Sequence, residues 1–115
     1  MRPILKSLLV FVVLAAAGFA AADFAETKKK AEAGKANAQY YLGVLYALGD
    51  GVPKDDAEAL KWWRLAAEQG NDEAQGILGA AYNEGKLVRK DEAAAVKWYR
   101  LAAEQGNAQS QYNLG

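Results

Sequence analysis

A block of ten residues, Lys61–Gly70, returns 36 positions later as Lys97–Gly106 with one substitution. Aligning residues 34–69 with residues 70–105 gives 20 identities in 36 positions without a gap. Self-similarity at a fixed period of this length is typical of helical repeat arrays. The sequence therefore predicts an all-α fold: an α/α solenoid, or superhelix, of antiparallel helix hairpins that form a short array with a 36-residue period.

The repeated block is expected to form the second helix of each hairpin. Its apolar residues cover roughly 220° of the helix circumference, which leaves Lys61, Arg64 and Glu68 on the opposite side. A helix with more than half of its surface apolar needs neighbours on two sides. Each copy must therefore pack between other helices of the array.

The first helix of each hairpin is expected in residues 38–46, a segment that recurs at residues 74–82. Gly43 and Gly79 would let a facing helix approach closely, because glycine has no Cβ. We predict a repeat core drawn from both helices. Its residues are Leu42, Gly43, Tyr46, Ala59, Trp62, Ala66, Leu78, Gly79, Tyr82, Ala95, Trp98 and Ala102.

Two short turns connect the helices, at residues 49–54 and 85–90. The first glycine of each turn can end the preceding helix in a left-handed conformation. Leu87 stands in the second turn where the first has Gly51. The second turn therefore either relaxes or follows a different backbone path.

The chain divides into five predicted segments. They are a signal peptide in residues 1–22, a capping half-repeat helix in residues 23–34, repeats in residues 35–70 and 71–106, and a truncated first helix of a third repeat in residues 107–115. In the signal, Arg2 and Lys6 precede an apolar run, and small residues offer a cleavage site near Ala22. The run is shorter than the ~20 apolar residues of a spanning helix, which favours cleavage over an uncleaved anchor.

The last segment, residues 107–115, is too short to be stable as an isolated helix. We expect it to be ordered only if it packs on the preceding helix. One interpretation of the whole chain is therefore a passive fragment of a longer repeat protein, since such arrays usually need about three repeats.

Composition excludes several classes of site. The chain has no cysteine and no histidine, which removes disulfides, lipid attachment and the usual zinc, copper and haem ligands, so we expect no metal and no cofactor. The signal contributes Arg2 and Lys6 to the 14 basic residues, so 12 remain against 14 acidic ones, a net charge of −2. We expect no nucleic-acid partner and no membrane contact beyond the export signal.

No catalytic residue is expected. A serine hydrolase needs a nucleophile beside a base, and after the signal the hydroxyl side chains besides tyrosine are Thr27 and Ser110. Ser110 stands at the position of Ala38 and Ala74, where a small residue suits packing. We therefore predict that the protein is not an enzyme.

The pattern Ala-Gln-x-x-Leu-Gly-x-x-Tyr-x-x-Gly, then Val-x-Lys-Asp, then Ala-x-Lys-Trp-x-Arg-x-Ala-Ala-Glu-Gln-Gly resembles the Sel-one-like repeat, a relative of the tetratricopeptide repeat, over residues 34–115. The resemblance implies a right-handed superhelix whose first helices line a concave surface, with a scaffold or adaptor role. Bacterial members are commonly exported to the envelope, which implies a periplasmic or secreted protein. Cysteine-rich members are credited with binding or hydrolysing β-lactams, so a cell-wall-directed or β-lactam hydrolase is the alternative, although this chain lacks their cysteines.

One stripe of the first helices varies between copies while the core positions repeat. Variation of this kind suits a surface shaped for one protein or peptide partner, and the resemblance places such segments on the concave face. The competing interpretation is that Tyr40 and Val44 pack on the next first helix. The predicted partner-binding residues are Tyr40, Val44, Ala47, Gly76, Ala80, Asn83 and Tyr112.

Overall fold

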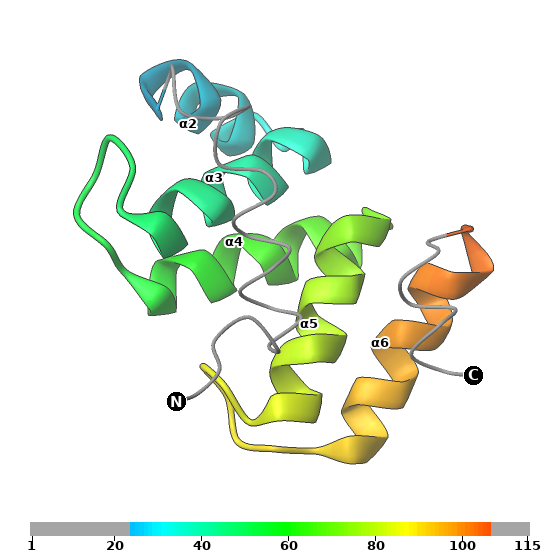
Figure 1. Ribbon diagram of the computed structural model, residues 1–115. Helices are drawn as coiled ribbons and strands as arrows, with labels where there is room; N and C mark the ends of the chain where they lie inside the picture. Colours follow the sequence, from blue (N-terminus) through cyan, green and yellow to red (C-terminus); the bar gives the residue numbers. More distant parts are fainter. Residues whose placement is uncertain (1–23, 107–115) are drawn as a thin grey trace.

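The computed structural model describes residues 24–106, which form five α-helices. They are α2 (Phe24–Glu32), α3 (Ala36–Leu48), α4 (Asp56–Glu68), α5 (Asp72–Glu84) and α6 (Glu92–Glu104). Each helix packs on the next along the chain, and α3 with α4 and α5 with α6 form hairpins (Figure 1). The prediction of paired helix hairpins is confirmed, because α3 and α5, like α4 and α6, begin 36 residues apart.

Two predicted segments lie outside the described residues: the signal peptide in residues 1–22 and the third-repeat helix in residues 107–115. Among the helices between residues 24 and 106, none combines the length and the apolar character that crossing a bilayer requires.

The second helix of each hairpin begins at an aspartate that makes two contacts. The carboxylate of Asp55 accepts a hydrogen bond from the backbone N–H of Glu58 at 3.1 Å. The backbone N–H of Asp55 donates to the carbonyl of Tyr46 at the end of α3, at 2.9 Å. Asp91 repeats the cap in the second hairpin. The cap therefore satisfies an orphan amide of the new helix and ties the turn to the preceding helix.

The two turns follow the same backbone path. Gly49 and Gly85 end the first helices with φ values of 70° and 69°. Two residues later Gly51 has φ 78° and Leu87 has φ 71°. The second turn therefore does not relax, and Leu87 adopts the left-handed conformation that disfavours a side chain by about 1–2 kcal/mol.

Each hairpin is closed by an aromatic ring that lies on a glycine. The Trp63 ring covers Gly43, and a Cβ built on Gly43 would overlap the indole. The indole Nε1 also donates a hydrogen bond of 3.1 Å to the carbonyl of Tyr40. In the second hairpin a Cβ on Gly79 would lie 2.7 Å from Cδ1 of Tyr99. Both glycines are therefore required by the close approach of the two helices.

A chain of glutamine amides, of which Gln39 and Gln75 are buried, joins each hairpin to the helix before it. Gln69 at the end of α4 donates to the side-chain oxygen of Gln39 at 2.8 Å. Gln39 in turn donates to the carbonyl of Ala31 in α2 at 3.1 Å. Gln105 and Gln75 repeat the first bond one hairpin later, also at 2.8 Å. These bonds hold three consecutive helices in a fixed register.

The first prediction concerns Gly43. An ordinary Gly→Ala change inside a helix stabilises it by about 1 kcal/mol. Gly43→Ala should instead lower the free energy of unfolding by about 1–3 kcal/mol, because the methyl group must displace the Trp63 ring. Urea denaturation followed by circular dichroism measures the difference. Ala57→Gly, at an exposed position of α4, provides the intrinsic Ala–Gly difference. A more stable Gly43→Ala protein would contradict the close contact.

The second prediction concerns the left-handed residue of the second turn. Leu87→Gly should raise the free energy of unfolding by about 0.5–1 kcal/mol, since relief of backbone strain exceeds the extra chain entropy of glycine. The reverse change in the first turn, Gly51→Leu, should destabilise, and its Cβ would also lie 3.1 Å from Cβ of Phe24. Thermal unfolding of both variants tests the pair; a loss of stability in Leu87→Gly would show that the leucine side chain outweighs the strain.

Candidate functional site

The residues predicted as repeat core lie inside the hairpins. Tyr46 and Tyr82 are half-buried and pack against the core clusters. The remaining ten are buried: Leu42, Gly43, Ala59, Trp62, Ala66, Leu78, Gly79, Ala95, Trp98 and Ala102. Trp62 is 8% exposed, and its Nε1 is buried without a hydrogen-bond partner among the described residues. The tryptophans therefore serve packing and offer no stacking surface to a ligand.

The structure corrects the predicted partner stripe at three positions. Tyr40, Val44 and Ala80 are 3%, 0% and 0% exposed, so a partner cannot reach them. Tyr40 and Val44 belong to the same core cluster as Ala74 and Ile77 of α5. The stripe on α3 therefore packs towards the next first helix, as the competing interpretation held, because α3 has helices on two of its sides.

The other members of that stripe are differently placed. Ala47 and Gly76 are half-buried, and Asn83 is exposed. Tyr112 lies outside the described residues. On the first helices, Asn37 of α3 and Glu73 of α5 are also exposed, at equivalent positions of the two repeats. Sequence reasoning missed both, although their polar character at one repeat position was a usable signal.

A hollow that the sequence analysis did not predict is lined by residues of α2, of α3 and of the turn between them. These two helices lie at one end of the array (Figure 1). The volume of the hollow is ≈470 Å³, within the usual range for ligand pockets. We call it the α2–α3 hollow. Its lining consists of Thr27, Lys30, Lys35, Ala36, Asn37, Ala38 and Tyr41.

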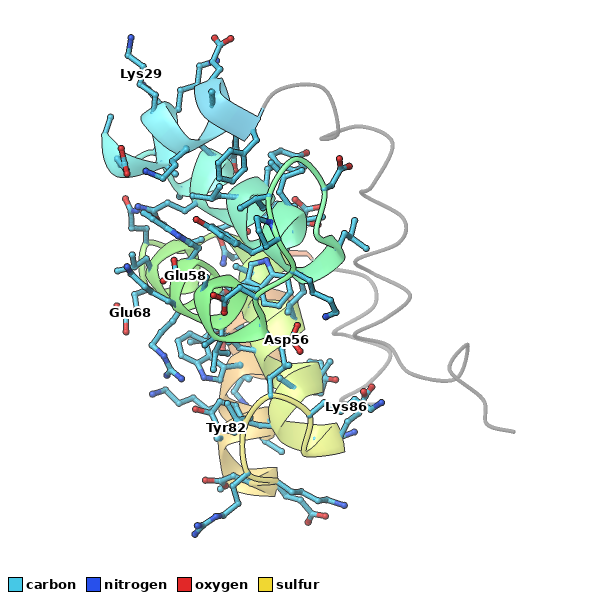
Figure 2. The ribbon with its side chains drawn as sticks, turned by 90° about the vertical axis from the view of Figure 1, so that its left-hand side faces the viewer. Lys29, Asp56, Glu58, Glu68, Tyr82 and Lys86 are labelled. Carbon is cyan, nitrogen blue, oxygen red and sulfur yellow. The ribbon has the colours of Figure 1, made fainter. Side chains whose placement is uncertain are left out.

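A second hollow of ≈630 Å³ adjoins the first and shares Lys30 and Lys35 with it. Lys30 forms an ion pair with Glu26 at 3.4 Å. Between residues 24 and 106, neither Lys29 nor Lys35 has a carboxylate within 4.0 Å. Lys29 is at the rim of the second hollow and points away from the helices (Figure 2). The mouth of the hollows is therefore positively charged.

Tyr41 gives the hollow its aromatic wall. Its ring lies 4.9 Å from that of Tyr40, centroid to centroid. Partial burial, and then the Glu73 carboxylate, raise the pKa of Tyr41. Burial is also the main cause that raises the pKa of Tyr40. Both phenols therefore stay neutral in the physiological pH range, and Tyr41 contributes apolar surface and a hydroxyl group to the hollow.

The Glu73 carboxylate is an acidic group that raises the pKa of both tyrosines. Partial burial of its carboxylate, followed by repulsion from Asp72, raises the pKa of Glu73, although the residue as a whole is exposed. Among the described residues, no group of three or more His, Cys, Asp or Glu side chains could hold a metal ion. Lysines line the hollows, and Glu73 supplies a negative charge on α5.

The two complete hairpins, with a single helix packed before them, define a helical repeat protein of the α/α type. Its repeats match the Sel1 repeat at residues 36–71 and 72–107. The chain belongs to the Sel1 repeat family, which confirms the resemblance of its motifs. It is a Sel1 repeat scaffold with two repeats.

Solved structures of two bacterial proteins are similar to this chain. One is a protective antigen present in uropathogenic Escherichia coli strains that displays an SLR fold, with a TM-score of 0.77 and 44% identity over 92% of this chain. This chain spans 24% of the antigen's length. The other is a Sel1 repeat protein from Oxalobacter formigenes, with a TM-score of 0.75 and 42% identity over 77% of this chain and 67% of that one. No curated protein matches the chain.

The third prediction concerns the pH dependence of stability at Glu73. The pKa of Glu73 is raised above 4.5 in the folded state. The folded protein therefore binds this proton more tightly than the unfolded chain does. The carboxylate therefore destabilises the fold above the raised pKa, and this effect disappears below the unfolded value. Glu73→Gln should be more stable than the natural protein at pH 7, with the gap closing as the pH falls below 4.5. Lower stability of the variant at pH 7 would show that attraction to the start of α5 dominates.

Proposed function

We propose that the protein is an exported scaffold that binds a peptide or a segment of another protein on its concave face. The single observation that carries the proposal is the contrast between the two sides of each repeat. The twelve predicted core positions form six identical pairs, such as Leu42 and Leu78, whereas one exposed position of the first helices holds Asn37 in α3 and Glu73 in α5. A rigid repeated frame with a non-repeated surface suits recognition of one partner.

Export is the second part of the proposal. It is supported by the charged start, the apolar run and the small residues of residues 1–22. Similarity to an antigen present in uropathogenic Escherichia coli strains also supports it. The mature scaffold would begin at Asp23, next to the start of α2.

The fourth prediction tests partner binding directly. The full chain carries a photo-crosslinking phenylalanine analogue in place of Glu73 or Asn83, both exposed on α5. It is expressed with residues 1–22 in a Gram-negative bacterium and irradiated. We expect a covalent adduct with one defined protein in the periplasmic fraction.

Matched controls place the same analogue at Ala57 or Ala93, which are exposed on the second helices. These positions should give no such adduct, because the partner is expected on the first helices. Equal adducts from both sides, or none from α5, would contradict the proposal. Recovery of the chain only from the cytoplasm would contradict export.

A further inference from the structure

The repeat register identifies what the α2–α3 hollow is shaped for. Adding 36 to each lining position gives its counterpart in the complete hairpins. The polar Thr27 and Lys30 correspond to Trp63 and Ala66 of α4. The half-buried Ala38 and Tyr41 of α3 correspond to residues of α5. The four counterparts, Trp63, Ala66, Ala74 and Ile77, are each 0% exposed.

Residues of α3 belong to the core cluster that contains these four counterparts. They share a core cluster with Tyr40 and Val44, which both belong to α3. Trp63 of α4 donates to the carbonyl of Tyr40, and Asn71, which caps α5, donates to the side chain of Asn37, so α3 contacts α4 and the start of α5. One repeat earlier in the array, α2 and α3 stand in the positions of α4 and α5. The α2–α3 hollow is therefore the place that a first helix would take beside the half-repeat.

We propose that this hollow binds an amphipathic α-helix of the protein partner, with an acidic first turn, in the place that α3 takes against α4 and α5. The proposal rests on the proposed function and adds the position and chemistry of the partner segment. The docked helix would present apolar side chains at i, i+4 and i+7 towards Ala38 and Tyr41. This is the spacing of Tyr40, Val44 and Ala47 on α3.

The charge of the lining specifies the acidic first turn. Lys35 stands at the position of Asn71, whose side chain donates to Oδ1 of Asn37 at 2.9 Å. By the same register, Lys35 faces the second residue of the docked helix. A carboxylate there would meet an ammonium group that has no ion pair within residues 24–106. Acidic residues also suit the positive end of a helix dipole.

Charge also distinguishes between two candidate occupants of the hollow, a helix of the partner and the first residues of this chain. Residues 1–22 contain no aspartate or glutamate, and they carry Arg2 and Lys6. Residues 1–22 therefore cannot supply the acidic first turn. An acidic helix from a partner is therefore the better complement to the hollow.

The experiment uses two synthetic peptides with the sequence of residues 36–48, the 13 residues of α3. One carries Asn37→Glu and its twin carries Asn37→Lys, and each has a fluorescent label. Binding to the full chain is measured by fluorescence anisotropy at low salt. We expect the Glu peptide to bind about fivefold more tightly than the Lys peptide, the difference typical of one exposed charge pair.

Charge reversal on the protein makes the result specific to the hollow. Lys35→Glu should invert the preference of the two peptides. Lys54→Glu, at an exposed position of the α3–α4 turn, should leave the preference unchanged. Circular dichroism melts confirm that both variants fold. Equal affinities, or a preference that Lys35→Glu does not invert, would overturn the assignment.

Failure of this test is distinct from failure of the proposed function. If adducts form from α5 while the peptides show no charge preference, the scaffold function stands and the α2–α3 hollow is a solvated cap. If the peptides show the inverted preference, amide shifts of Thr27 and Tyr41 in an NMR titration should accompany it. Shifts confined to other helices would place the peptide elsewhere and overturn the assignment.

Discussion

The contact between Trp63 and Gly43 sets the geometry on which the rest of the structure depends. The indole ring occupies the space that a side chain on Gly43 would fill, and its Nε1 donates to the carbonyl of Tyr40 at 3.1 Å. The ring of one helix therefore packs directly on the backbone of the other, because Gly43 places no side chain between them. Tyr99 repeats the contact on Gly79, with a smaller ring and a Cβ distance of 2.7 Å. The close approach of the two helices is therefore kept with a different aromatic ring.

The glutamine bonds transmit this geometry from one hairpin to the next. Gln39 and Gln75 are 5% and 4% exposed, so each amide would be costly to bury without partners. Each finds them in the glutamine that ends one helix and in a carbonyl of the helix before, as Gln39 does with Gln69 and Ala31. The net energy of such bonds is modest. Their main effect is orientation, because each bond fixes how one helix lies relative to its neighbour.

The 36-residue period was sufficient to predict the helices, their pairing and most of the core, because these depend on the repeated residues. It was not sufficient for Tyr40 and Val44. A helical wheel separates a core face from the remaining surface, but α3 has a second buried face towards α5, which only the stacking of hairpins reveals. Nor could the period decide the path at Leu87, because the cost of a left-handed leucine is small beside the energy that holds both helix ends in place.

The α2–α3 hollow is hard to predict from the sequence, because it depends on a helix that the half-repeat lacks. The hollow is the space that a first helix would fill in a complete repeat. No single segment of the sequence therefore indicates it. The signal lies in a comparison: Thr27 and Lys30 stand where the complete repeat has Trp63 and Ala66. Without a tryptophan in α2, a neighbouring helix does not need a glycine at the crossing point. The hollow therefore does not require a glycine in a bound helix. Its lysines and Tyr41 would instead favour a helix with the matching charge and the matching spacing of apolar side chains.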